Sequence, residues 1–577
     1  MSSSLSRRKF MRVSAQGMVA ASLGSFLVSE FAAGSQSASP YQPLFTALDR
    51  FIEQYLRQMN APGLTFVMAD RSGVQRVAAY GFSEPETKVP VNPDQLFEIG
   101  SISKSFLAVC LLQLHDERKL DLQRPITEYL PWFRLESSFA PITIHHLLTH
   151  TAGLAGNAPV FLTDPVAKHR AANPPGQDFH YCNTGYALLG HLLETLDGKS
   201  LSQSFRARIF DPLGMAASEP VITLDFRDRL AKNYEAFRTD RPYARFDRLA
   251  EAPAIVMTDA SGCIAATPHD MGLYVQMIAS HGAAPQARLM SESGFGLFSK
   301  RHIPAEEFGP TASYGYGIAV DSLDGHTVVR HTGGMVSFAS ALHVDIDEGV
   351  GAFASINAMQ GYRPNPVAQY ALQLMRAHRA GQPLPEPPKI PPATFIENPQ
   401  QYAGVYTASD GKKWEFQADA ANLYLVVSGQ RIPVETIVGS QQMLIIRAPE
   451  WDRYALTFGR EKSDDPKSRV VEAAWGPLCF FNSAYSGPKT FDYPKEWDRY
   501  TGHYRNESPW VGSLRVLIRK GKLYVDGVTP LEPASDGYFY FRDEPHSPEW
   551  LRFHDFVNGK AMRVKASGED LWRVSAD

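Results

Sequence analysis

Hydrophobic and polar positions follow different rhythms in the two halves of this chain. Near its start, apolar residues recur at steps of four, three and four, which predicts an amphipathic helix through Leu44, Leu48, Phe51 and Tyr55. From residue 101 to about residue 281 the pattern is mainly helical, and runs rich in β-formers precede and follow it. The expected helices include 101–118 and 186–196, and the expected strands are 63–69, 75–81, 314–320, 326–331, 337–344 and 350–356.

This order of elements predicts the architecture of the first half. Strands on both sides of a helical insertion imply one antiparallel sheet, assembled from the two ends of the segment and flanked by helices. We expect this α/β (α+β) domain to occupy residues 40–382. Residues 383–392 (PLPEPPKIPP) hold six prolines in ten, so 383–394 should form a semi-rigid linker that few contacts cross.

An internal repeat organises the second half. Residues 402–406 (YAGVY) recur as 500–504 (YTGHY), and Leu423-Tyr424 recurs 100 residues later. Residues 449–454 (PEWDRY) recur as 548–553 (PEWLRF). Each copy contains short β-rich segments bounded by turn residues, and closure into a small antiparallel β-barrel removes exposed sheet edges. The expected limits of the two barrels are 395–487 and 490–577.

The composition is that of a soluble globular protein. The 577 residues are 44% hydrophobic and 20% charged, and a net charge of −4 provides no basic surface for nucleic acid. The four cysteines are scattered without a C-x-x-C pair, so neither a zinc site nor a disulfide framework is indicated. They are Cys110, Cys182, Cys263 and Cys479.

The first 38 residues have the features of an export signal. Residues 6–11 (SRRKFM) place two arginines before a hydrophobic pair, a mildly apolar stretch follows at 13–29, and small residues follow at 32–34. This order predicts a twin-arginine signal peptide over 1–38 and a bacterial protein that is periplasmic or secreted. The alternative is a basic tail on a first helix. We expect no integral membrane segment once the leader is removed, because no other run approaches the length of a membrane span.

A candidate nucleophile stands at the start of the helical region. Ser101 and Lys104 are one helical turn apart on the same face, and an adjacent amine can take the proton of a serine hydroxyl. The Ser101 backbone N–H, at a helix start, also points toward a developing oxyanion. The S-x-x-K pattern occurs elsewhere, as at Ser409 and Lys412, but that pair crosses an Asp-Gly turn.

Tyr181 and Asn183 form a second candidate pair just before a predicted helix. Nearby lysine cations can lower the pKa of a tyrosine toward useful base strength, and the Asn183 amide can hold Lys104 and a substrate carbonyl. The competing interpretation is a buried tyrosine followed by a helix-capping asparagine.

A third segment follows the strand-like run that leads to His331. This segment, His331-Thr332-Gly333-Gly334, has two polar side chains followed by two glycines. The glycines let a substrate backbone lie along a sheet edge. The competing interpretation is an ordinary turn after a strand.

Taken in order, these three motifs resemble those of the penicillin-recognising serine hydrolases. That family includes class C β-lactamases, DD-carboxypeptidases, D-aminopeptidases and certain esterases. Residues 149–154 (THTAGL) and 314–317 (YGYG) are also similar to family segments, and the resemblance covers about 42–380. The resemblance implies a β-lactamase-like domain, which consists of an antiparallel sheet with a helical insert and precedes the two barrels.

The resemblance also implies roles for the motif residues. Ser101 would be the acylated nucleophile, with Lys104 and Tyr181 as the proton-transfer pair; which of the two is the resting base stays open, since coupled groups titrate as a unit. Asn183 would orient Lys104 and substrate, and the backbone N–H groups of Ser101 and Gly334 would form the oxyanion hole.

His331 departs from the family pattern, because many relatives have lysine there. A histidine is only partly charged near neutrality and should grip a substrate carboxylate less firmly, which weakens the β-lactamase interpretation. If His331 reads such a carboxylate, affinity for these substrates should rise as pH falls from about 8 to 6. The barrels are similar to those of D-stereospecific aminopeptidases, in which a loop from the last barrel approaches the active site. Their third motif is typically His-Gly-Gly, whereas Thr332 intervenes here, and the barrels could equally be a packing module.

The predicted function is therefore that of an exported serine hydrolase acting through an acyl-enzyme on small amide or peptide substrates, D-amino-acid peptides among them. The alternatives are a carboxylesterase or β-lactamase of the same fold, and, from another class, a penicillin-acylated sensor or binding protein. No metal or other cofactor is expected, since Leu147 stands between His146 and His150 where a zinc-protease helix needs glutamate. The sequence does not indicate an oligomeric state.

Overall fold

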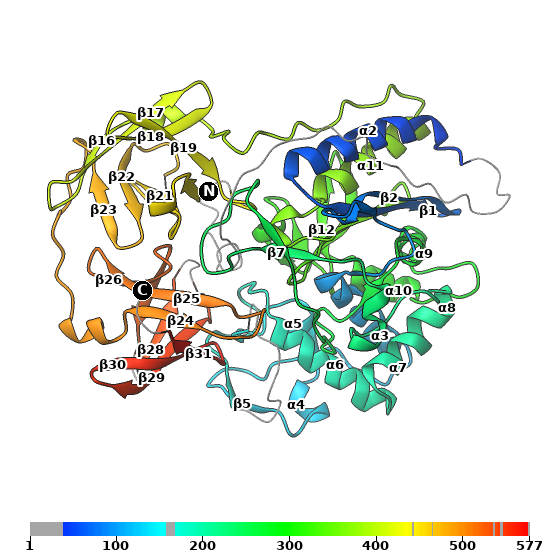
Figure 1. Ribbon diagram of the computed structural model, residues 1–577. Helices are drawn as coiled ribbons and strands as arrows, with labels where there is room; N and C mark the ends of the chain where they lie inside the picture. The colour runs from blue at the N-terminus through cyan, green and yellow to red at the C-terminus, as the bar shows by residue number, and fades with distance from the viewer. Residues whose placement is uncertain are drawn as a thin grey trace.

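The computed structural model describes residues 39–156, 168–440, 443–463, 465–534, 537–542 and 546–574. The predicted leader lies outside these residues. Figure 1 shows a part built of sheet and helices beside two barrels formed by the second half of the chain. Every helix in the described ranges is too short or too polar to cross a membrane.

The first half forms one nine-stranded sheet in which neighbouring strands are antiparallel. Strand β1 pairs with β2 on one side and with β15 on the other, so the two ends of this half meet in the middle of the sheet. This confirms the predicted architecture. In spatial order the strands are β10 (Ile303–Pro304), β11 (Ser313–Tyr314), β12 (Ala319–Leu323), β13 (His326–Gly334), β14 (Ala339–Asp345), β15 (Val350–Ile356), β1 (Gly63–Asp70), β2 (Gly73–Glu84) and β3 (Val89–Pro90).

Helices cover both faces of this sheet. On one face lie α2 (Gln42–Met59) and α11 (Asn365–Arg379), which pack against each other (Figure 1). The four apolar positions that predicted the first helix are all buried in α2, because they form a single stripe that faces the sheet. On the other face, α9 (Pro268–Ala279) packs against β1, β2 and β15.

The helical insertion continues the layer on the α9 side, and its buried residues join those of the sheet in one large core. Within it, α3 packs against α6, which brings the starts of these two helices into one region. The helices of this layer are α3 (Ser103–Asp116), α4 (Ile126–Tyr129), α5 (Ile144–Leu148), α6 (Asn183–Asp197), α7 (Leu201–Phe205), α8 (Asp211–Leu213) and α10 (Glu292–Phe298).

One expected strand is wrong. Residues 314–320 form the end of β11, a tight turn and the start of β12, instead of one strand. The Gly315 N–H donates to the carbonyl of Ile318 (2.8 Å), which closes the turn. Gly317 has φ +71°, and a Cβ there would lie 2.5 Å from the Lys104 carbonyl oxygen. The turn therefore packs directly on the start of α3, and only glycine fits at that contact.

The second half forms two closed barrels, as predicted. The repeat is visible in matching hydrogen bonds: the Tyr406 hydroxyl donates to the Tyr402 carbonyl (3.0 Å), and the Tyr504 hydroxyl donates to the Tyr500 carbonyl (2.7 Å). The strands of barrel 1 are β16 (Gly404–Thr407), β17 (Lys413–Asp419), β18 (Asn422–Val427), β19 (Gln430–Thr436), β20 (Leu444–Ile446), β21 (Leu456–Arg460), β22 (Val470–Trp475) and β23 (Leu478–Phe481). Those of barrel 2 are β24 (Gly502–Arg505), β25 (Ser513–Arg519), β26 (Lys522–Val525), β27 (Thr529–Pro533), β28 (Tyr538–Phe541), β29 (Trp550–Val557), β30 (Lys560–Ala566) and β31 (Glu569–Arg573).

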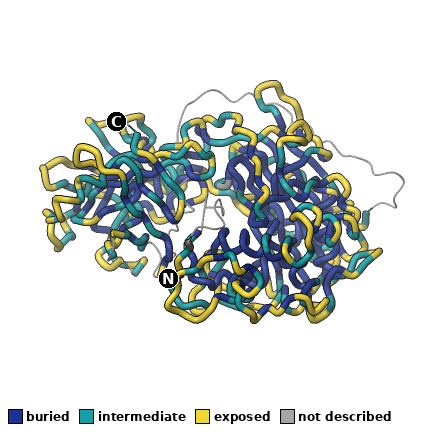
Figure 2. Tube along the Cα trace, turned by 90° about the horizontal axis from the view of Figure 1, so that it is seen from below, coloured by how far each residue is buried: buried dark blue, intermediate teal, exposed yellow. Residues whose placement is uncertain are grey.

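Barrel 1 shares a hydrophobic core with the α2–α11 face of the sheet, which differs from the expectation that few contacts cross the linker. Val438 is buried, its Cγ1 would lie 2.5 Å from a Cβ on Gly361, and its N–H donates to the Tyr243 carbonyl (3.2 Å). Buried segments occur both in the sheet-and-helix part and in the barrels (Figure 2). The barrel residues in this shared core are Ile437, Val438, Met443, Ile445 and Ala455.

Ion pairs tie one loop of the first half to both barrels. This loop lies between β7 (Tyr234–Ala236) and β8 (Leu249–Glu251). From barrel 2, Arg515 Nη2 lies 2.7 Å from Asp240 Oδ2. Toward barrel 1, Arg241 Nη1 lies 3.0 Å from Asp452 Oδ1. The loop is therefore a junction of all three parts.

We expect Asp240→Asn to weaken this junction in a pH-dependent way. Burial would raise the pKa of Asp240, but hydrogen bonds from Arg241 and Arg515 outweigh it and lower the pKa from 3.8 to about 2. A depressed carboxyl pKa contributes stability that is present above pH 4 and is lost as pH falls toward 2. The variant should lose up to about 2 kcal/mol of unfolding free energy at pH 7 and progressively less below pH 4.

Chemical denaturation at pH 7, 4 and 2.5 measures this difference. Asp228→Asn is the matched control, since the side chain of Asp228 is 96% exposed. A constant gap between Asp240→Asn and the unmodified protein at all three pH values would contradict the assignment.

Candidate active site

Ser101 and Lys104 lie at the entrance to α3. Gly100 has φ +55°, a left-handed conformation that turns the chain from β4 (Phe97–Glu98) into the 3₁₀ turn η1 (Gly100–Ile102) and on into α3. Lys104 is fully buried and Ser101 is partly exposed, so the hydroxyl is accessible while the amine is enclosed. Lys104 Nζ donates to Ser101 Oγ over 3.2 Å.

Two further acceptors fix the Lys104 amine. One is the side-chain oxygen of Asn183 at 2.8 Å, and the other is the carbonyl of Ser261 at 2.6 Å. The Ser261 N–H in turn donates to Asp259 (2.7 Å), which holds that carbonyl in place. Three acceptors surround the Lys104 nitrogen, so the amine has one defined position beside the hydroxyl.

Asn183 therefore does not act as a helix cap. The N-cap of α6 is Cys182, and Asn183 is the first helical residue, with its amide oxygen directed at Lys104. The contact with Lys104 takes the place of the capping contact that the competing interpretation predicts.

The ring of Tyr181 is held between Lys104 and His150. Lys104 Nζ lies 4.8 Å from the ring centroid, and the His150 ring stacks on Tyr181 with centroids 4.1 Å apart and planes at 26°. His150 is itself fixed, because its Nδ1 accepts the Cys182 N–H at 3.0 Å. The structure thus brings Ser101, Lys104, Tyr181 and Asn183 together at the starts of α3 and α6.

His331 lies on the neighbouring strand β13 and is engaged on both ring nitrogens. Its Nε2 lies 3.0 Å from the Tyr314 hydroxyl, and its Nδ1 donates to the Thr332 carbonyl (2.7 Å). The residue is 2% exposed. Reading a substrate carboxylate would require these bonds to be exchanged, so the arrangement differs from that expected of a carboxylate receptor.

Gly333 and Gly334 bring the end of β13 against the residues that precede Ser101. A Cβ on Gly333 would lie 1.8 Å from the Ile99 carbonyl oxygen, and a Cβ on Gly100 would lie 2.8 Å from the Gly334 nitrogen. Backbone therefore touches backbone here. This contact places the Gly334 nitrogen beside Gly100, the residue that precedes Ser101.

Two buried carboxyls influence the electrostatics around this region. Burial raises the pKa of Glu98, three residues before Ser101, to about 8, so this carboxyl is protonated at neutral pH. Burial also raises the pKa of Asp259, although hydrogen bonds to Ser261 and the charge of Lys104 oppose it.

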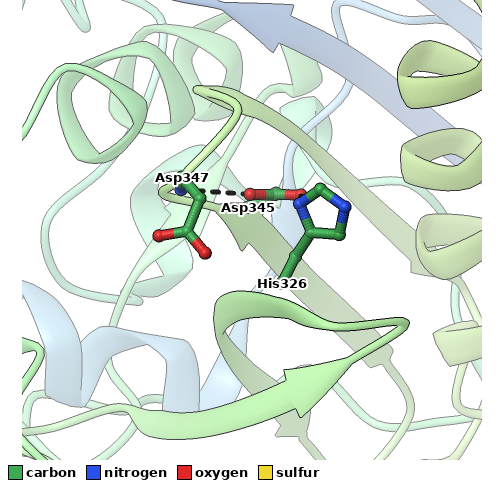
Figure 3. A group of neighbouring side chains, drawn as sticks. All are labelled: His326, Asp345 and Asp347. Atoms are coloured by element: carbon green, nitrogen blue, oxygen red, sulfur yellow. Dashed lines mark hydrogen bonds and ion pairs between the residues drawn. The ribbon is translucent and has the colours of Figure 1, made fainter. Parts of the chain in front are cut away.

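One group of side chains in the described residues has the spacing of metal ligands: His326, Asp345 and Asp347 (Figure 3). It lies where β13 and β14 meet. Arg376 Nε already lies 2.8 Å from Asp345 Oδ2, and the Asp347 N–H donates to Asp345 Oδ1 (3.1 Å). A guanidinium thus neutralises the buried carboxylate, and the group stabilises the turn after β14.

The two histidines of the predicted helix segment 146–150 also bond to backbone. His146 Nδ1 accepts the Thr143 N–H (3.1 Å) as part of a capping box, and His150 serves Cys182 as described. Each has a structural partner of its own.

A protein-family model described as Beta-lactamase matches residues 48–376, more than half of the chain. The chain belongs to the β-lactamase family. Penicillin-binding protein 4* of Bacillus subtilis (strain 168) is 24% identical over 414 residues, which cover 67% of this chain and 88% of that protein. A teichoic acid D-alanine hydrolase of Staphylococcus aureus (strain MRSA252) is 25% identical over 243 residues, which cover 41% of this chain and 58% of that protein.

The same fold occurs in an octameric penicillin-binding protein homologue from Pyrococcus abyssi. Its TM-score is 0.54 at 23% identity, and the match covers 76% of this chain and 100% of that chain. Together these findings make this protein a serine hydrolase of the β-lactamase family.

Three contributors to the site did not emerge from the sequence. They are the Ser261 carbonyl, the Tyr314 hydroxyl and the carboxylate of Glu549 in barrel 2, which bonds to the residue before Tyr181. A carbonyl carries no side-chain signature. In the sequence, Tyr314 belongs to a segment similar to one of the family's, and Glu549 belongs to the repeat, but neither pattern assigns the residue to the site.

Proposed function

We propose that this β-lactamase-family protein is an exported hydrolase that cleaves small amide or peptide substrates, including D-amino-acid peptides, through an acyl-enzyme on Ser101. The observation that carries the proposal is the position of Lys104 Nζ, 3.2 Å from Ser101 Oγ and 2.8 Å from Asn183 Oδ1. A serine hydroxyl becomes an effective nucleophile when a fixed base stands within hydrogen-bond reach.

In the first step, Ser101 Oγ attacks the substrate carbonyl carbon while its proton passes to the Lys104–Tyr181 pair. The carbonyl oxygen gains the negative charge, which the N–H groups of Ser101 and Gly334 stabilise. The C–N bond then breaks, and the pair returns the proton to the departing amine. Water, deprotonated by the same pair, attacks the acyl-enzyme ester and releases the acid and Ser101.

The substrate class is supported by the relatives and by His331. One relative is named for hydrolysing D-alanine from teichoic acid, so a D-alanyl acyl group is a reasonable first choice. Engagement of both His331 nitrogens weakens the case for penicillins, whose carboxylate needs a cation partner. The same observation favours a second candidate, carboxylesterase activity, because neutral esters make no such demand.

A substrate panel tests the proposal. Purified protein is assayed on D- and L-alanine p-nitroanilides, p-nitrophenyl esters, a D-Ala-D-Ala peptide and a chromogenic cephalosporin. We expect steady turnover of the D-alanyl amide at least about tenfold above the L-form and the cephalosporin. Turnover of esters alone would identify an esterase. An acylation burst without turnover would instead indicate a penicillin-acylated sensor.

We expect that His331 does not discriminate between substrates with and without a carboxylate. For a D-alanyl peptide with a free C-terminus and its C-terminal amide, the ratio of the two KM values should stay within about twofold from pH 8 to 6. His331→Gln should depress both substrates alike, because it disturbs the bond to Tyr314. A preference for the free carboxylate that grows as pH falls would restore the carboxylate-reading role.

A further inference from the structure

A buried carboxylate connects barrel 2 to the segments that precede Tyr181 and Asn183. Glu549, immediately before β29, accepts two hydrogen bonds on Oε1: from the Gly156 N–H at 2.9 Å and from His180 Nε2 at 3.0 Å. The side chains of His180 and Glu549 are only 6% and 4% exposed. These bonds join residues 393 and 369 positions apart in the sequence.

The two donors of these bonds also fix the Tyr-x-Asn motif. The His180 N–H donates to the His150 carbonyl (2.8 Å), and His150 is the residue stacked on Tyr181. The Gly156 carbonyl accepts the Asn183 N–H (2.8 Å), which sets the start of α6. Glu549 therefore bonds to His180, the residue that precedes Tyr181. It is also linked to Asn183 by two successive hydrogen bonds through Gly156.

The internal repeat shows that the barrel fold does not itself need this carboxylate buried. Glu450 occupies the equivalent place in barrel 1, within the same Pro-Glu-Trp sequence, and it is exposed. Burying a carboxylate costs several kcal/mol unless hydrogen-bond donors compensate. In barrel 2 two compensating donors come from the catalytic domain, the Gly156 N–H and His180 Nε2.

We propose that Glu549 is a positioning residue for Tyr181 and Asn183, which makes barrel 2 part of the catalytic machinery. The inference rests on the proposed function of Ser101, Lys104 and Tyr181. Without the carboxylate, Gly156 and His180 lose their common acceptor. The Tyr181 ring is then no longer fixed at its position beside Lys104 Nζ. Protonation of the leaving group is the step that suffers most.

Glu549→Ala and Glu549→Gln in the full-length protein test this role, with Glu450→Ala as the matched control from the repeat. Two substrates with the same D-alanyl group are compared: an amide, whose amine must be protonated as it leaves, and a p-nitrophenyl ester, whose phenolate leaves unaided. For Glu549→Ala we expect kcat to fall about 100-fold on the amide and less than about tenfold on the ester, with KM within about threefold. Glu549→Gln should stay within about threefold of the unmodified protein, because its amide oxygen accepts the same two bonds. Glu450→Ala should not differ from it.

An equal loss on both substrates would overturn the proposal, because a smaller folded fraction lowers both rates alike. Unchanged amide turnover in Glu549→Ala would overturn it as well. If Glu549→Ala fails to fold, His180→Leu breaks the same link from the other side and should show the same selective loss; a double variant that folds should lose no more than either single one. The proposed function fails separately, in the unmodified protein, if Ser101 is not acylated.

Discussion

Ser101→Ala is expected to lower kcat by at least about 1,000-fold on every substrate that the protein turns over. The substitution removes the one atom that forms the acyl bond. It also removes the acceptor of the Lys104 bond at 3.2 Å, but leaves the Asn183 and Ser261 acceptors in place. Because Ser101 is partly exposed and no cavity forms, the melting temperature should change by less than about 3 °C.

Steady-state kinetics, thermal melting and mass spectrometry after an acylating probe measure these effects. Ser409→Ala is the matched control, since Ser409 and Lys412 share the S-x-x-K spacing but lie at an exposed turn of barrel 1. If Ser101→Ala retained more than about a hundredth of the activity, Ser101 would not be the nucleophile.

Ending the chain at residue 382 should abolish cooperative folding, and with it all acylation. Barrel 1 contributes Ile437, Val438, Met443 and Ile445 to the core that α2 and α11 share. At about 1.5–3 kcal/mol for each buried side chain, their loss removes about 6–12 kcal/mol, which is comparable to the whole stability of a domain. Circular dichroism melting and probe labelling of the shortened protein check this expectation.

A second shortened form, ending at residue 487, separates the two barrels. It keeps the shared core but lacks Glu549 and Arg515, so it should fold, melt at a lower temperature and show the selective loss of amide turnover. A form ending at 382 that melts cooperatively and labels with one equivalent of probe would instead establish that the first half folds by itself.

Local pattern was sufficient to predict much of this fold. The stripe through Leu44, Leu48, Phe51 and Tyr55 predicted α2 because a helix that covers a sheet must present one apolar face. Strand β1 and strand β15 were expected in one sheet because strands occurred on both sides of a helical insertion. The repeat predicted two closed barrels, since each copy is short and rich in β-strands and closure removes exposed sheet edges.

The motif residues could be predicted to meet, but not how they are held. Lys104 and Ser101 are one turn apart, so their contact follows from helix geometry. The contacts of Lys104 with Ser261 and of Tyr181 with His150 join loops whose paths depend on packing elsewhere. The break within 314–320 was missed for the same reason: Gly317 is needed only because the turn meets the Lys104 carbonyl, a contact that strand periodicity cannot reveal.

The repeat illustrates the limit most clearly. Glu450 and Glu549 have the same neighbours in the sequence, yet one is exposed and the other is buried against His180. Which of the two glutamates contacts the catalytic domain is decided by the arrangement of the three domains, and the Pro-Glu-Trp sequence that they share does not distinguish them.

The bond between Gly156 and Glu549 spans 393 residues, and this separation bears on the order in which the molecule assembles. Contacts between distant residues form late. The entropy cost of closing so long a loop must be met before the contacts contribute stability, and that cost is smaller once the intervening chain is ordered. Both the sheet-and-helix part and barrel 2 must exist before Glu549 can bind its two donors. During refolding, secondary structure and the burial of aromatic residues should therefore recover before amide turnover does. The delay between these two recoveries measures how long the docking of barrel 2 takes.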